Sequence, residues 1–185
     1  MKMKMQSFIC ASLMASMAVT EETTKCHALV LSGGSNNGAW EAGVMWGLLH
    51  YGEPTDYAWD VVTGVSAGAI NTSGIATWAP GTEVEMTEWL SQQWVEMRSE
   101  DVWQERDVGA YDLIFKEPSI LDDSPGVVTL KALVNEKGEI ARRFTVTAVD
   151  VNTGDYIAMD NSNTAVEDLA QSAIASGSLP GVFPP

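Results

Sequence analysis

Histidine and cysteine, two residue types that often carry catalysis or metal binding, are scarce in this chain. The 185 residues include two of each. Cys10 falls in the N-terminal leader and Cys26 stands alone after it, so we expect no internal disulfide. No group of Cys and His residues has the spacing of metal ligands. We therefore expect neither a metal site nor a bound cofactor.

Positive charge is scarce as well. Ten Lys and Arg residues stand against 25 Asp and Glu residues, which gives a formal net charge of −15. This balance disfavours binding to nucleic-acid phosphates and electrostatic capture by anionic membranes. The simplest role of the acidity is solubility. The hydrophobic content of 45% is typical of a globular protein, and the length fits one domain with a sizeable core.

Hydrophobic runs long enough to cross a bilayer are absent from the sequence. The run Phe8–Ala18 is too short to span and follows two lysines. Small residues at its end fit a signal-peptidase site, so we predict a cleaved signal over 1–18 and a linker over 19–26. The protein would then be secreted or endomembrane. A disordered or mitochondrial leader is the alternative, and Glu21 and Glu22 disfavour the mitochondrial one.

The rest of the chain alternates predicted strands and helices. Short apolar or alternating runs predict strands at 27–31, 59–63, 143–149 and 156–159, the last pairing back on the third. Helical spacing predicts helices over 39–51, 67–78, 83–98 and 164–176. Residues 99–126 give no clear assignment. This order predicts an α/β fold with a mainly parallel sheet, whose ligand site lies at the carboxyl ends of the strands.

The sequence GVSAG at 64–68 falls between a predicted strand and a predicted helix. In such an elbow a strained turn presents the serine oxygen, here that of Ser66, while Gly64 and Gly68 leave room for the backbone. The helix that follows directs N–H groups at the developing oxyanion. A bare G-x-S-x-G arises by chance in roughly 5–10% of chains this long. The strand and helix around it favour a nucleophile over a plain turn.

No histidine follows Ser66, whereas the Ser-His-Asp triad of an α/β-hydrolase places its histidine after the serine. His27 opens the first predicted strand and His50 ends a predicted helix. We therefore expect a carboxylate as the base of Ser66, in a two-residue arrangement.

A glycine-rich turn at 33–38 follows the first predicted strand. It is not a P-loop, because no Gly-Lys-Ser/Thr follows, and Ser35 breaks the Rossmann pattern. Two interpretations remain open: an oxyanion loop of backbone N–H groups beside the nucleophile, or an ordinary strand-to-helix turn.

The chain resembles the patatin-like phospholipases, a family of serine acyl hydrolases. The resemblance rests on ALVLSGGSNNGAWEAGV at 28–44, DVVTGVSAGAINTSGIA at 60–76, FTVTAVDVNTGDYIAM at 144–159 and AIASGSLPGVFPP at 173–185. It covers nearly everything after the leader and makes residues 27–185 a partial patatin-like domain.

The resemblance implies a three-layer α/β/α sandwich and a Ser-Asp dyad that cleaves acyl esters of lipids or phospholipids at a membrane or micelle surface. Ser66 matches the nucleophile, Gly33, Gly34 and Gly38 match the oxyanion loop, and Ser35 stands where a third glycine is usual. Asn37 replaces the family's basic residue.

The family's catalytic Asp lies in an Asp-Gly motif shortly after the segment that ends in FPP, and this sequence stops at Pro185. Four later acids fall in places that do not match: Asp150, Asp155, Asp160 and Asp168. We therefore expect a domain incomplete at its C-terminus, with little or no hydrolase activity as it stands. A non-catalytic protein that binds lipid or a partner protein is the alternative function, and acyl transfer would use the same residues.

Asn71-Thr72-Ser73 forms a glycosylation sequon. It lies one helical turn past the predicted elbow, where we expect the side chain to be packed and to carry no sugar.

Overall fold

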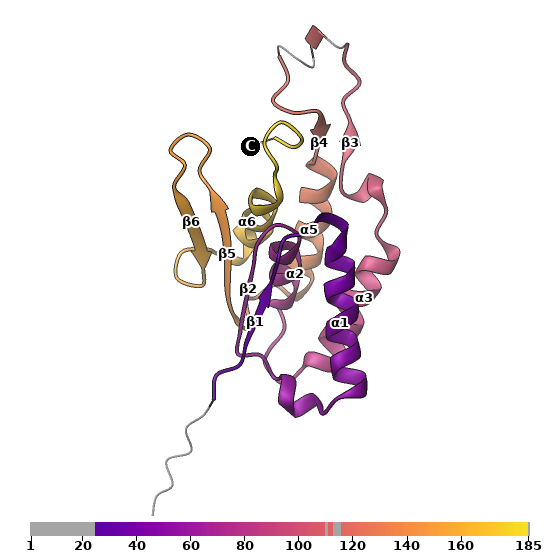
Figure 1. Cartoon of the computed structure of the whole chain (residues 1–185), viewed down its shortest axis with the longest axis vertical. Coiled ribbons are helices and arrows are strands. Elements are labelled where there is room, and N and C mark those ends of the chain that lie inside the picture. Colours follow the sequence, from indigo (N-terminus) through magenta and orange to yellow (C-terminus); the bar gives the residue numbers. More distant parts are fainter. Residues whose placement is uncertain (1–24, 110, 113–115, 185) are drawn as a thin grey trace, which may run out of the picture.

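A computed structural model describes residues 25–109, 111–112 and 116–184 (Figure 1). The predicted signal over 1–18 and most of the linker therefore lie outside the described residues. The main sheet has the order β1-β2-β5-β6. The first three strands are parallel, and β6 pairs antiparallel with β5. Their bounds are Ala28–Leu31 (β1), Val61–Gly64 (β2), Arg143–Val149 (β5) and Tyr156–Asp160 (β6).

The helices pack against one face of this sheet (Figure 1). α2 and α6 contact the strands, α1 and α3 pack together beside α2, and α5 packs on α6. Right-handed crossovers between parallel strands that advance in one direction put their helices on the same face. The bounds are Gly38–Tyr51 (α1), Ala67–Ile75 (α2), Glu83–Glu96 (α3), Ser124–Lys137 (α5) and Val166–Gly177 (α6).

Alternation along the strands separates a buried face from an exposed one. Val62, Phe144 and Val146 are at most 1% exposed and join the core with residues of the helices. On the opposite face Val30 and Val149 remain mostly exposed. The α/β class and the mainly parallel sheet are thereby confirmed. A third layer on the exposed face stays a prediction.

A long arm projects beyond the sheet between α3 and α5 (Figure 1). Its two short strands, Gln104–Glu105 (β3) and Leu121–Asp122 (β4), pair antiparallel. The final described segment binds the base of the arm, since the N–H groups of Ile120 and Leu121 donate to the carbonyls of Gly181 and Val182. No helix within the described ranges is long and apolar enough to cross a membrane.

Two sequence-based assignments need correction. α5 had no assignment, although Pro125 at its first turn and Gly138 in the left-handed region (φ 74°) mark its ends. The helix after the elbow was predicted to reach Trp78 but ends at Ile75. There the chain turns so that the Ala76 carbonyl accepts hydrogen bonds from the N–H groups of Ala141 and Arg142.

Candidate active site

Ser66 occupies a sharp turn between β2 and α2. Its backbone has φ 56° and ψ −122°, and it is one of two described non-glycine residues with positive φ. Such a conformation costs about 1–3 kcal/mol and persists only where the surroundings enforce it. Ser66 is also the N-cap of α2, so the positive end of the helix dipole lies at its position. The strand, sharp turn and helix expected around Ser66 are present.

The glycines of the elbow are required by close backbone approaches. A Cβ at Gly64 would lie 2.2 Å from the Gly68 carbonyl oxygen, and one at Gly68 would lie 2.5 Å from the Leu31 carbonyl oxygen. No real side chain tolerates such contacts with backbone atoms. The two glycines therefore let α2 begin directly against the ends of β1 and β2.

The glycine loop lies against Ser66. A Cβ at Gly33 would be 3.1 Å from Ser66 Cβ and 3.7 Å from Ser66 Oγ. Ser35 begins a short 3₁₀ turn, Ser35–Asn37, with φ 54°. That conformation favours glycine, the residue that the family usually has here. The loop is therefore placed beside Ser66 as predicted, with a strained serine in it.

Several N–H groups at this end of the sheet have no acceptor among the described residues. They are those of Gly33, Gly34, Ser35 and Ala67, whereas the Gly68 N–H binds the carbonyls of Ser32 and Val65. Gly33 and Ser35 are exposed, so their N–H groups are open to solvent and to a bound group. Donors gathered around a serine oxygen can stabilise a negative charge that develops there.

The N–H of Ser66 itself is held by Ser176 of α6, a residue that site prediction missed. Ser176 Oγ accepts from the Ser66 N–H at 2.8 Å and donates to the Thr147 carbonyl on β5 at 2.5 Å. One hydroxyl thus links the elbow, α6 and β5. Ser176 lies in the segment 173–185 that resembles the family, and this resemblance could have pointed to it.

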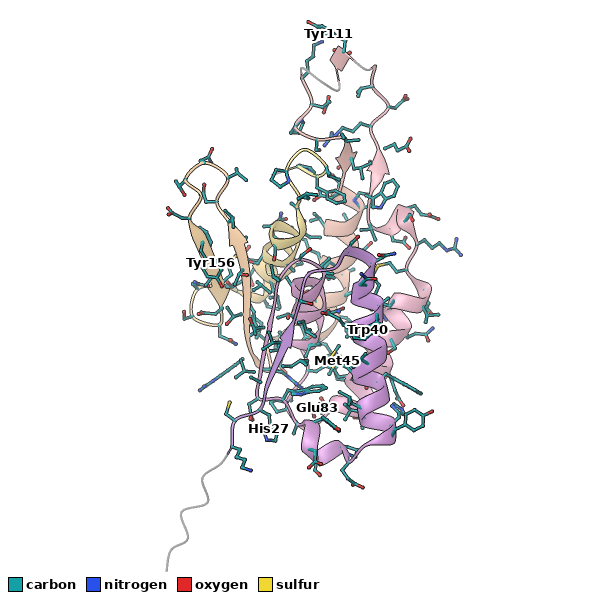
Figure 2. The ribbon with its side chains drawn as sticks, in the orientation of Figure 1. His27, Trp40, Met45, Glu83, Tyr111 and Tyr156 are labelled. Atoms are coloured by element: carbon teal, nitrogen blue, oxygen red, sulfur yellow. The ribbon has the colours of Figure 1, made fainter. Side chains whose placement is uncertain are left out.

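A hollow of about 310 Å³ opens beside the loop, lined by Ser32, Gly33, Gly34, Asn37, Trp40 and Glu41. Trp40 is 71% exposed, and Figure 2 shows it on α1. A large exposed ring next to an opening is suited to contact with an apolar group. Within the described ranges, no group of three or more His, Cys, Asp or Glu residues could hold a metal ion.

Neither histidine reaches the elbow. His27 lies just before β1, at the opposite end of the strand, where its N–H donates to Asp60 (Figure 2). His50 stacks on Trp46 near the end of α1 and bonds Glu88 at 3.3 Å. The sequence argument against a histidine base thus holds for both.

Two of the later carboxylates, those of Asp150 and Asp160, have structural partners elsewhere. Asp150 accepts from the N–H groups of Asn152 and Thr153 in the β5–β6 turn, and these bonds lower its pKa. Asp160 accepts from Ser162, whose hydroxyl and N–H lower its pKa. Among the described residues no carboxylate is hydrogen-bonded to Ser66 Oγ.

Comparisons with known proteins find one matching family and several similar solved structures. A family model described as patatin-like phospholipase matches residues 29–185. VipD from Legionella pneumophila is similar at 15% identity and a TM-score of 0.45, over 85% of this chain and 43% of that one. A chain of the heterodimeric ExoU–SpcU complex from the type III secretion system of Pseudomonas aeruginosa is similar at 18% identity and a TM-score of 0.43. The match covers 85% of this chain and 37% of that one.

This chain therefore spans less than half the length of those two solved chains. No curated protein matches it. The family model, in contrast, covers the main sheet except Ala28, together with the glycine loop and the turn at Ser66. On that match, the chain belongs to the patatin-like phospholipase family.

Proposed function

We propose that the protein is a lipid acyl hydrolase of the phospholipase A or esterase type, with Ser66 as its nucleophile. One observation carries the proposal: Ser66 has a strained positive-φ backbone at a helix N-terminus, beside a loop with unpaired N–H groups. A surface turn without chemistry has no need to retain this strain.

The reaction would proceed through an acyl-enzyme. Ser66 Oγ attacks the ester carbonyl carbon while its proton passes to a carboxylate base. The carbonyl oxygen becomes an oxyanion that accepts from the N–H groups of Gly33 and Gly34 and faces the N-terminal end of α2. The alcohol leaves with a proton from the base, and water then hydrolyses the acyl-serine. Because Asn37 supplies no positive charge, oxyanion stabilisation rests on N–H groups and the helix dipole.

The base is the part of the proposal that depends most on the family. We propose a Ser-Asp dyad, whose Asp the family pattern expects in an Asp-Gly motif soon after Phe183–Pro184. The intact mass and C-terminal peptides of the native protein test this expectation. The same spectra test the proposed secretory leader, because cleavage after Ala18 would give a new N-terminus at Val19.

A fluorophosphonate probe tests the nucleophile. We expect the native protein to be labelled at Ser66, as read by peptide mapping, and to hydrolyse a p-nitrophenyl acyl ester. Ser66→Ala should lose both signals and keep its thermal unfolding temperature. Ser162→Ala, in an exposed turn after β6, should lose neither. Labelling that survives Ser66→Ala would rule out the proposed nucleophile.

A non-catalytic lipid- or protein-binding role is the second candidate. Two residues of the loop favour it: Ser35 strains the backbone, and Asn37 removes a charge from the oxyanion site. A native protein that resists the probe and shows no ester turnover, yet binds vesicles of neutral lipid, would support this role over hydrolysis.

A further inference from the structure

A buried asparagine joins the glycine loop to the helix of the nucleophile. Asn71 lies one turn into α2 with a fully buried side chain. Its Nδ2 donates to the Gly38 carbonyl and to Glu41 Oε2, each at 3.0 Å. Its Oδ1 accepts from Trp94 Nε1 at 2.8 Å. Acceptors on one side and a donor on the other fix the orientation of the amide. The burial also agrees with the expectation of no sugar on Asn71.

Glu41 extends this link to the other end of the loop. Its Oε1 accepts from the Ser32 N–H at 2.9 Å, while Oε2 holds Asn71. Ser32 comes directly before the glycine loop, and Gly38 ends it. Asn71, on the helix that follows Ser66, thus binds the Gly38 end of the loop directly and the Ser32 end through Glu41.

Trp94, on α3, contacts both Gly38 and Asn71. Its ring packs so tightly on Gly38 that a Cβ there would lie 2.6 Å from the ring. Its N–H satisfies the remaining face of the Asn71 amide. Charge-assisted hydrogen bonds such as those of Glu41 are shorter and stronger than neutral ones, and a fully satisfied buried network specifies one geometry.

We propose that Glu41, Asn71 and Trp94 are positioning residues that hold the oxyanion loop at a fixed place against Ser66. The inference rests on the proposed function. Between its two fixed ends the loop carries the unpaired N–H groups of Gly33, Gly34 and Ser35. Such donors stabilise an oxyanion only when they are held in place before the charge develops.

The sharpest test is Trp94→Phe in the full-length native protein, which removes one N–H and keeps a ring over Gly38. We expect kcat for a p-nitrophenyl ester to fall about tenfold, with KM nearly unchanged, because the lost stabilisation belongs to the transition state. The matched control is Trp89→Phe in the same helix. The N–H of Trp89 is buried without an acceptor among the described residues, so its removal should leave kcat unchanged.

A second readout does not depend on activity. Hydrogen exchange of a peptide spanning 32–38 should be faster in Trp94→Phe than in wild type, and unchanged in Ser66→Ala and Trp89→Phe. Equal loop exchange and equal kcat in the two tryptophan variants would overturn the proposal. Faster loop exchange in a protein whose wild type shows no Ser66-dependent turnover would support the positioning network and overturn the proposed function.

Moving the carboxylate from position 41 to position 71 should restore part of the lost kcat. Asn71→Asp places a second carboxylate beside Glu41 and should reduce kcat more than Trp94→Phe does. Adding Glu41→Gln lets the glutamine donate to the new carboxylate while it still accepts from the Ser32 N–H. The double variant should therefore recover part of the lost kcat. Strictly additive losses would contradict a direct contact between the two side chains.

Discussion

The polar groups at the two ends of the parallel strands differ in their hydrogen-bond partners. At the carboxyl ends, Ser66 and Ser35 have strained backbones, and neighbouring N–H groups have no acceptor within the part of the chain that the structure describes. At the amino ends, Arg142 and Glu83 form a buried ion pair at 3.0 Å. Arg142 also donates to the carbonyls of Trp59, Trp78 and Ala79, and Glu83 accepts from the N–H groups of Trp59 and Gly81.

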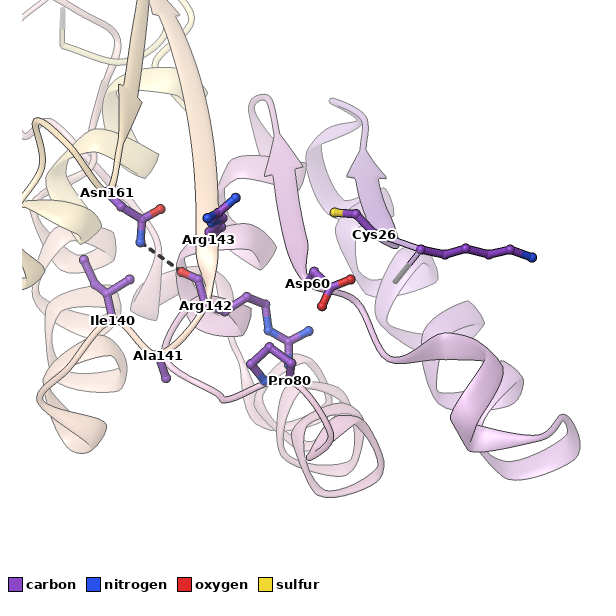
Figure 3. Close-up of a pocket in the computed structure, with 9 residues that line it drawn as sticks. Cys26, Asp60, Pro80, Ile140, Ala141, Arg142, Arg143 and Asn161 are labelled. Carbon is purple, nitrogen blue, oxygen red and sulfur yellow. Dashed lines mark hydrogen bonds between the residues drawn. The ribbon is translucent and has the colours of Figure 1, made fainter. Parts of the chain in front are cut away.

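The ion pair at the amino ends is saturated. Burial lowers the pKa of Arg142, and the charge of Glu83 opposes that shift. Each guanidinium nitrogen has an acceptor, so the charges are compensated on all sides. A hollow of about 540 Å³ beside the pair holds Lys25, Cys26, Asp60 and Arg143 at its rim (Figure 3). It is the larger hollow of the two, yet Ser66, the proposed nucleophile, lies at the other end of the strands.

The two ends differ in whether their polar groups have hydrogen-bond partners, more than in polarity or in cavity size. Arg142, Glu83 and Asp60 at the amino ends have fixed partners. At the carboxyl ends the backbone strain of Ser66 and Ser35 costs stability, and the exposed N–H groups of Gly33 and Ser35 are open to a ligand. Mutations at the two ends should therefore separate stability from reactivity.

The largest effect is expected at the amino ends. Arg142→Met leaves the Glu83 carboxylate buried without its cation and should lower the free energy of unfolding by about 3–5 kcal/mol. Urea denaturation measures it. Adding Glu83→Gln should recover part of the loss. The rate of fluorophosphonate labelling per folded molecule should stay at the wild-type value. A slower rate would show that the two ends are coupled.

The next effect is expected at the elbow. Gly68→Ala forces a methyl group to within 2.5 Å of the Leu31 carbonyl oxygen. The shift of α2 should cost about 1–3 kcal/mol, and Ser66 labelling should slow. Gly43→Ala is the control, because a Cβ at Gly43 meets nothing within 4 Å. It should stabilise α1 by about 0.5–1 kcal/mol. Equal stability of the two variants would contradict the close approach.

A smaller loss of stability is expected at Ser176, whose hydroxyl joins the Ser66 N–H to β5. Ser176→Ala removes the acceptor of the Ser66 N–H and should cost about 1–2 kcal/mol, measured by thermal unfolding, with slower labelling of Ser66. Ser172→Ala, on the same helix, removes only a bond to the Asp168 carbonyl one turn earlier. Its labelling rate should match wild type.

The smallest effect has the opposite sign. Ser35→Gly relieves a left-handed conformation that costs a non-glycine residue about 1–2 kcal/mol. The greater freedom of glycine in the unfolded chain offsets part of that gain. A net stabilisation of about 0.5 kcal/mol is expected from the two, measured by urea denaturation. Destabilisation would mean that the Ser35 side chain makes a contact worth more than the strain.

Local sequence predicted the strand–turn–helix around Ser66, the glycine-rich turn at 33–38 and the mainly parallel sheet. Each depends on neighbouring residues: glycines at fixed spacing, an apolar run before them and a helical pattern after them. α5 was missed because Ser124-Pro125-Gly126 resembles a turn, although the same residues suit a first helical turn.

The contacts that complete the site could not be predicted this way. Asn71 meets Glu41 and Trp94, which lie 30 and 23 residues away. Ser176 meets Ser66 across 110 residues. From the local sequence alone, a polar residue at these positions could cap a helix, form a turn or face solvent. Its actual partners are set by how the helices pack.

The exposed face of the sheet affects how such experiments are run. Val30, Val149 and Tyr156 are 74%, 62% and 71% exposed there. An apolar surface of this kind adsorbs to plastic, to micelles and to other copies. A preparation of residues 25–184 would thus be expected to lose material at low concentration and to bind detergent at a place unrelated to Ser66. Turnover should be normalised to titrated Ser66, because total protein would misstate the number of working sites.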